Sequence, residues 1–112
     1  MPINWSDDIV ISDLADEPDL SEELNELYSR LREAPGDKVP NVILNLGGVT
    51  YLNSSNIAQL LRLRKRLIEA QRKLKLCSTT DAVWSIMLLT GLDKVFFFAP
   101  DKATAIAAMQ ID

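Results

Sequence analysis

The stretch that decides the fold is Asn41 to Gln71, with the sequence NVILNLGGVTYLNSSNIAQLLRLRKRLIEAQ. Its first part, Val42 to Leu46, is the kind of apolar, β-branched run that forms a buried strand. A long amphipathic helix is predicted from Ser55 to about Arg72, because apolar side chains recur there at helical spacing and charged ones fill the other side. This strand and helix predict an α/β domain.

Two hydroxyl groups, those of Ser54 and Ser55, lie where this helix begins, directly after Asn53. The unpaired N–H groups and the dipole of a helix N-terminus favour an anion. A phosphate attached to either hydroxyl would therefore be stabilised. The plainer interpretation is that both serines only cap the helix.

Length and composition suit one globular domain over residues 1–112, because the chain is 47% hydrophobic and 25% charged. Residues 1–8 are expected to form a mobile end. No apolar run approaches the roughly 20 residues that cross a bilayer, so we expect no membrane insertion and a cytoplasmic location. Histidine is absent and Cys77 is the only cysteine. We therefore expect no enzyme, no metal site and no cofactor, with Cys77 as a small buried apolar side chain.

The charges divide along the chain. Residues 1–37 carry eleven acidic and two basic side chains, whereas residues 38–112 carry five acidic and ten basic ones. Seven of these bases lie between Arg62 and Lys75, but no aromatic residues are interleaved with them and the whole chain is acidic, with a pI near 4.8. A solvated helix face is therefore favoured over nucleic-acid binding.

The N-terminal third predicts a short strand at Ile9–Ile11 and a surface helix from Leu20 to Ala34, with Asp19 placed to cap it. The acidic segment before Pro18 is expected to be a solvated, mobile end.

The C-terminal part predicts strands at Leu74–Ser78 and Val95–Phe98 and helices at Ala82–Thr90 and Asp101–Met109. Together these elements predict a mixed, mostly parallel sheet of four to five strands with about four helices packed on it. The side chains expected in the core include Ile57, Leu61, Trp84, Met87 and Phe97.

Two segments carry a resemblance to a known family. NVILNLGGVTYLNSSNIAQLLRL resembles the central motif of STAS domains, the fold of bacterial anti-sigma factor antagonists, and GLDKVFFFAPDKATAIAAM resembles the closing pattern of that family. The match covers about residues 39 to 110. The resemblance implies a protein-interaction and regulatory module that binds a kinase-type anti-sigma factor, a serine kinase of the histidine-kinase-like ATPase class. Phosphorylation at the helix start would switch that binding off.

The resemblance implies that Ser55 is the phosphorylated residue, with Ser54 as the alternative. Asn45 and Asn53 stand where the family usually has aspartates, and Asn56 stands where it usually has glycine. An amide can cap a helix but cannot bind a metal cation strongly, so slow phosphorylation is expected. The residues implied to bind the partner are Asn53, Ser54, Ser55, Asn56 and Gln59.

Two other functional classes fit the sequence. STAS-like domains also resemble accessory subunits of transporters and larger stress-signalling scaffolds, which the identity of the bound partner would distinguish. A small-ligand or nucleotide-binding domain could use the helix N-terminus as its anion site, and a ligand-induced rise in melting temperature would test this.

Overall fold

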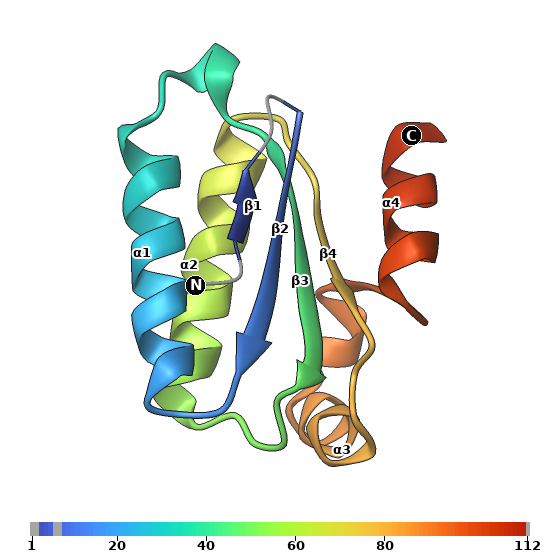
Figure 1. The fold of residues 1–112 in the computed structure, drawn as a ribbon. Coiled ribbons are helices and arrows are strands. Elements are labelled where there is room, and N and C mark those ends of the chain that lie inside the picture. The colour runs from blue at the N-terminus through green and yellow to red at the C-terminus, as the bar shows by residue number, and fades with distance from the viewer. Residues whose placement is uncertain (1–2, 6–7, 112) are drawn as a thin grey trace.

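The computed structural model describes residues 3–5 and 8–111, and within them it contains one five-stranded sheet and four helices (Figure 1). The strands are β1 (Ile3–Trp5), β2 (Ile9–Ala15), β3 (Asn41–Gly48), β4 (Leu74–Cys77) and β5 (Phe97–Ala99). The helices are α1 (Asp19–Glu33), α2 (Ser54–Glu69), α3 (Asp81–Thr90) and α4 (Lys102–Ile111). Short 3-10 turns lie at Gly36–Lys38 and Leu92–Lys94.

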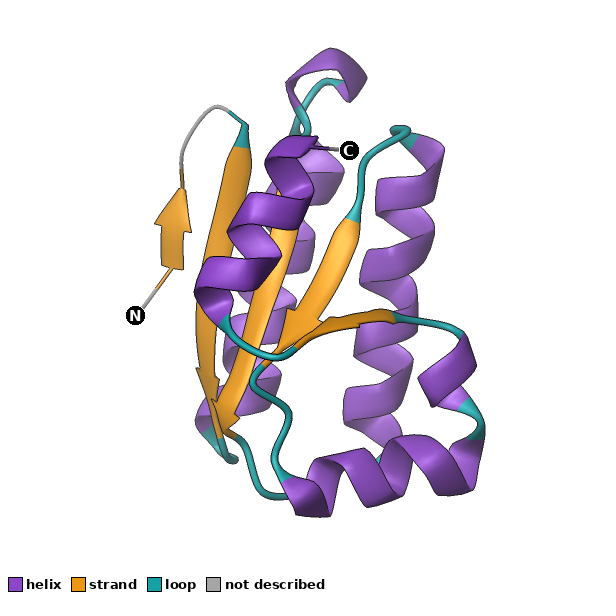
Figure 2. Ribbon diagram, turned by 90° about the vertical axis from the view of Figure 1, so that its right-hand side faces the viewer, coloured by secondary structure: helices purple, strands orange, loops and turns teal. Residues whose placement is uncertain are grey.

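The strands lie side by side in chain order, with β1 antiparallel to β2 and the other neighbours parallel. Because each parallel crossover advances in the same direction, right-handed connections place α1, α2 and α3 on one face of the sheet. α4 follows the last strand and covers the opposite face (Figure 2). The predicted mixed, mostly parallel α/β sheet with four helices is confirmed.

β3 lies at the centre of the sheet and contributes to two hydrophobic clusters. Val42 and Leu44 point to the face covered by α1, α2 and α3, whereas Ile43 packs with Met109 of α4 on the other face. Cys77 belongs to the α4 side and is fully buried, as predicted. The alternation of a strand therefore places Asn45, two residues after Ile43, on the α4 face at the carboxyl end of β3.

Several element boundaries differ from the predictions. β1 lies outside the predicted strands and falls within residues 1–8, which were expected to be a mobile end; residues 1, 2, 6 and 7 of that end lie outside the described residues. β2 continues to Ala15, so the acidic segment before Pro18 is in part a strand and the prediction of a solvated end is wrong. β5 begins at Phe97, two residues later than predicted, because Val95 has helical backbone angles after the Leu92–Lys94 turn.

Caps explain where the helices begin and end. Thr80 accepts a hydrogen bond from the N–H of Val83 at 3.3 Å, and Asp101 accepts one from Thr104 at 2.7 Å, as their sequence positions predict. Gly91 ends α3 with a φ of 75°, the left-handed conformation that glycine permits. The expected cap by Asp19 is wrong: α1 starts at that residue, and Glu17 instead accepts a hydrogen bond from the N–H of Ser21 at 2.8 Å.

The burial predictions are mixed. Met87 is fully buried and Ile57 is half-buried against the core. Leu61 is 38% exposed, Trp84 37% and Phe97 72%, so the prediction that these three lie in the core is wrong. Phe97 lies on the edge strand β5, where it pairs with Lys75 of β4 on a face that α4 leaves open. The adjacent Phe98 points to the other face and packs against the core.

Candidate functional site at the start of α2

The first turn of α2 is closed by a reciprocal pair of asparagines. The Oδ1 atom of Asn53 accepts a hydrogen bond from the N–H of Asn56 at 2.8 Å, and Oδ1 of Asn56 accepts one from the N–H of Asn53 at 3.0 Å. This capping box satisfies two backbone donors. The cap is therefore made by the two asparagines, and the two serines between them take no part in it.

Ser54 and Ser55 are both exposed. Among the described residues their hydroxyls have no hydrogen-bond partner, and neither do their backbone N–H groups. Since an unpaired first turn attracts anions, a phosphate on Ser55 would lie next to two free N–H donors.

Asn56 is completely buried and its amide joins α2 to α1. Its Nδ2 atom lies 3.2 Å from Oε2 of Glu17, 3.3 Å from Oγ of Ser21 and 3.3 Å from Oε1 of Gln59. The hydroxyl of Ser21 also donates to Glu17. Hydrogen bonds from Ser21, with a further one from Asn56, lower the pKa of Glu17 below its usual range.

Gln59 continues this network one turn further along α2. It is 7% exposed, and its Nε2 atom donates to the carbonyl of Ser21 at 3.1 Å and to Oδ1 of Asn25 at 3.0 Å. Asn56 and Gln59, both predicted to contact a partner, therefore point inward and hold α2 against α1. The structure places Asn53, Ser54 and Ser55 of the predicted set at or near the surface.

Asp16 fixes the loop that leads into α2. Its carboxylate accepts hydrogen bonds from the N–H of Thr50 at 2.8 Å and from its hydroxyl at 2.7 Å. These bonds, the backbone one first, lower the pKa of Asp16. Thr80 of the neighbouring loop holds the same segment by donating to the carbonyl of Val49 at 2.8 Å.

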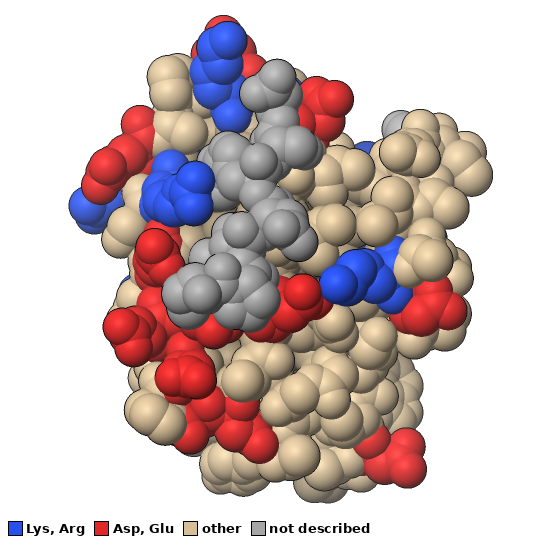
Figure 3. Space-filling view, in the orientation of Figure 1, with Lys and Arg blue, Asp and Glu red and all other residues tan. Residues whose placement is uncertain are grey.

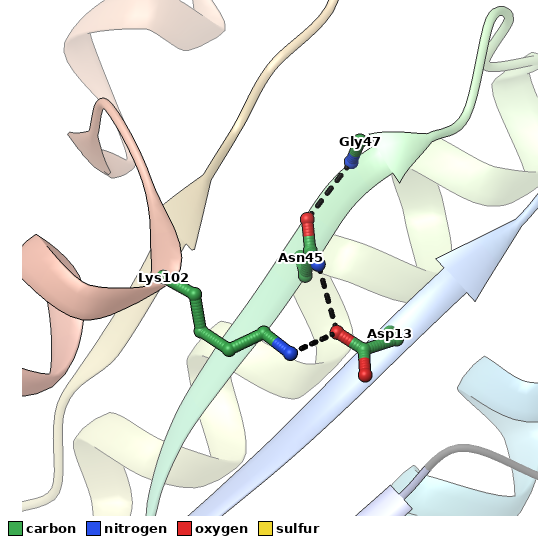
Figure 4. A network of polar contacts seen from close by, with 4 residues as sticks. All are labelled: Asp13, Asn45, Gly47 and Lys102. Carbon is green, nitrogen blue, oxygen red and sulfur yellow. Dashed lines mark hydrogen bonds and ion pairs between the residues drawn. The ribbon is translucent and has the colours of Figure 1, made fainter.

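Asn45 lies in a separate polar cluster on the α4 face (Figure 4). Its Nδ2 atom donates to Oδ1 of Asp13, its cross-strand partner, at 2.8 Å, and its Oδ1 atom accepts from the N–H of Gly47 at 3.0 Å. The amine of Lys102 at the start of α4 lies 2.9 Å from the same Asp13 oxygen and is the main cause of the lowered pKa of Asp13. The amide of Asn45 thus donates a hydrogen bond to the carboxylate of Asp13, which an aspartate at residue 45 could not do when ionised.

Asn45→Asp should therefore lower the free energy of unfolding by about 1–2 kcal/mol at neutral pH, since it sets two carboxylates opposite each other and removes a donor. The loss should shrink as the pH falls below about 4 and one carboxyl group is protonated. Urea unfolding of Asn45→Asp and of the natural protein, at neutral pH and below a pH of about 4, measures this loss of stability. Exchanging the groups in Asp13→Asn/Asn45→Asp should recover most of the loss, and a double variant no more stable than Asn45→Asp would contradict the pairing.

The sequence patterns did not reveal the acidic residues beside the site, Asp16 and Glu17, or Asp13 of the separate cluster. All three come from the end of β2 and the turn into α1, a segment that was expected to be a solvated end. Acidic side chains gather over that turn and the first part of α1 (Figure 3). The available signal was weak, because Ser12 and Asp13 interrupt the apolar run and only Leu14 continues the buried face that begins at Val10.

Comparison with known families agrees with this geometry. The family model described as "STAS domain" matches residues 12–105, which span β2 to α4. The chain belongs to the STAS domain family. The family resemblance expected from the central and closing motifs is thereby confirmed.

Solved STAS structures share the fold. An anti-sigma-factor antagonist (STAS) domain protein from Planctomyces limnophilus has a TM-score of 0.80 with 22% sequence identity, covering 96% of each chain. The RsbS protein of Moorella thermoacetica has a TM-score of 0.79 with 13% identity, covering 97% of this chain and 93% of the other. A chain of the stressosome, described as a signal integration and transduction hub, has a TM-score of 0.71 with 15% identity, covering 97% and 96%.

The described residues contain no group of three or more His, Cys, Asp or Glu side chains placed to hold a metal ion. No helix among them is long and apolar enough to cross a membrane. What the start of α2 offers is an exposed pair of hydroxyls on a rigidly capped helix end, which suits recognition and covalent modification by another protein.

Proposed function

We propose that the protein is an anti-sigma factor antagonist that binds a kinase-type anti-sigma factor through the start of α2 and is released from it by phosphorylation of Ser55. The observation that carries the proposal is the exposure of Ser54 and Ser55 beside a cap made entirely by other side chains. A kinase can reach such a hydroxyl without unwinding the helix.

The surface around the serines supports partner binding. Tyr51 is 64% exposed, and Ala58 and Leu61 are exposed on the same face of α2, four and seven residues after Ser54. We call these three residues together with Ser54 and Ser55 the α2 start surface. Aromatic side chains such as that of Tyr51 are enriched in protein interfaces, and adjoining exposed apolar groups mark such a surface. Asn56 and Gln59 would act from beneath by holding the surface in place.

The electrostatics of this surface support a charge switch. The partner would desolvate Ser55 on binding, and a phosphate there would bring a charge of about −1.5 to −2 into the interface. A buried charge without a counterion costs several kcal/mol. The Glu17 carboxylate, which contacts the Asn56 amide, adds negative charge on the same end of α2 and supplies no counterion.

Affinity purification of the tagged protein from its source cells, followed by mass spectrometry, tests this function. The expected result is recovery of a serine kinase of the histidine-kinase-like ATPase class. Phosphate on Ser55 is expected in the fraction of the tagged protein that is not bound to this kinase. Recovery of transporter subunits in place of a kinase would overturn the proposal.

A second candidate is a component of a stress-signalling scaffold, favoured by the similarity to RsbS and to the stressosome chain. In that case the purified assembly would contain many STAS subunits. Light scattering of the recovered complex separates the two candidates, because a switch pair has a small mass whereas a scaffold is far larger.

A further inference from the structure

A pocket of about 220 Å³ lies at the other end of α2, where the last turns of that helix meet the starts of β4 and β5. Ile68 on its rim is thirteen residues from Ser55, which places the pocket about 20 Å along the helix from the α2 start surface. The pocket is therefore separate from the proposed partner site.

Four cationic side chains line the pocket: Arg64, Arg72, Lys73 and Lys75. No carboxylate in the described part of the chain lines it. Arg64 and Arg72 form no ion pair with a described residue. The C-terminal end of a helix contributes about half a negative charge, which the two guanidinium groups of Arg64 and Arg72 outweigh. The pocket therefore favours an anion.

The floor of the pocket is apolar. Leu67 and Phe96 are 1% and 5% exposed, and Leu74 and Val95 lie beside them. Ile68 and Phe97 stand on the rim, 55% and 72% exposed, so large apolar surfaces face solvent directly beside the cations. Covering such surfaces removes apolar area from water, which favours binding.

The backbone holds the pocket in shape without a ligand. Gln71 has a φ of 59°, and the N–H of Arg72 reaches back to the carbonyl of Leu67 at 2.7 Å, which closes the end of α2. The N–H of Lys73 donates to Oδ1 of Asn41 at 2.8 Å. Arg72 and Lys73 therefore project from a fixed turn and Arg64 from the helix itself, which reduces the entropy lost on binding.

We propose that this pocket binds a small amphiphilic anion, with an apolar body packed between Leu67, Phe96 and Phe97 and an anionic head held by Arg64 and Arg72. The pocket is smaller than the roughly 300–1,000 Å³ of most ligand sites, so the body is a short acyl chain or one ring and not a full lipid. The guanidinium groups suit a carboxylate or a phosphate head through paired hydrogen bonds. This binding is independent of the function proposed for the α2 start surface.

Titration of the ¹⁵N-labelled full chain with octanoate tests the proposal, with phenyl phosphate as a second probe that distinguishes an acyl carboxylate from an aromatic phosphate. We expect octanoate to shift the amide resonances of Lys75 and Phe97, with a Kd of about 1 mM or tighter. Octanol lacks the charge and acetate lacks the apolar body, so each should bind at least about tenfold more weakly than octanoate.

Variants on the pocket wall complete the test. Arg72→Glu should weaken octanoate binding roughly tenfold, whereas Lys65→Glu, which makes the same charge change on the exposed side of α2, should alter it less than about twofold. Phe97→Ala removes an exposed rim residue without opening the core and should also weaken binding. The proposal would be overturned if neither octanoate nor phenyl phosphate bound at about 10 mM. Equal losses of affinity in Arg72→Glu and Lys65→Glu would also overturn it.

Discussion

Asn56→Asp is expected to lower the free energy of unfolding by about 3–5 kcal/mol at pH 7, a large part of the roughly 5–15 kcal/mol that holds a domain folded. The side chain is fully buried, and its Nδ2 atom lies 3.2 Å from the carboxylate of Glu17. Aspartate would replace this donor by a second carboxylate oxygen. The charge of the buried aspartate would then face the carboxylate of Glu17, which is itself exposed.

Urea unfolding followed by circular dichroism measures this loss. Asn56→Ala is the matched control, because it removes the same hydrogen bonds without adding charge, and it should cost only about 1–3 kcal/mol. Adding Glu17→Gln to Asn56→Asp should recover at least about 1 kcal/mol, because the new amide removes the repulsion and can donate. If aspartate cost no more than alanine, the proximity of Asn56 to Glu17 would have no electrostatic consequence.

Asn53→Asp should raise the rate of Ser55 phosphorylation at least several-fold with the cognate kinase and ATP. The family usually carries an aspartate here, and a carboxylate two residues before the hydroxyl can orient it or the metal-bound nucleotide. The helix cap uses Oδ1 of Asn53 as an acceptor, which aspartate retains, so the fold should be unaffected. Added repulsion against the phosphate opposes the gain by no more than about 1 kcal/mol, whereas a misplaced acceptor costs about 10²-fold in rate.

Initial rates of phosphate incorporation compare the two proteins directly. Ser55→Ala is the control that assigns the phosphate to Ser55 and not to Ser54. Fast, stoichiometric phosphorylation of the natural sequence, with no change in Asn53→Asp, would show that the amide is harmless and that the protein is an ordinary phosphorylation switch.

The fold was predictable from the sequence because its strong patterns are local. The apolar run before Gly47 and the amphipathic repeat after Ser55 specify β3 and α2, and the capping residues Thr80 and Asp101 mark two further helix starts. Exposure on a helix or edge strand was harder to predict. Leu61 and Phe97 look like core residues in the sequence, but their burial depends on what packs against them, which is a property of the assembled sheet.

The site was predictable only in part, for the same reason. Ser54 and Ser55 were located by the helix start, but the acidic residues that support them come from the turn between β2 and α1, more than thirty residues earlier. The amides of Asn45 and Asn56 look like weakened family positions in the sequence. In the structure each amide donates to a carboxylate, that of Asp13 or that of Glu17, and thus makes a hydrogen bond that the usual family residue at its position could not donate.

The central claim is that a partner binds the α2 start surface and that negative charge on Ser55 opposes this binding. Isothermal titration of the recovered partner into Ser55→Asp and Ser55→Ala tests it most directly, because both variants remove the hydroxyl and only one adds charge. We predict that Ser55→Asp binds at least about tenfold more weakly than Ser55→Ala, which corresponds to about 1.4 kcal/mol. Equal affinities of the two variants would contradict the claim.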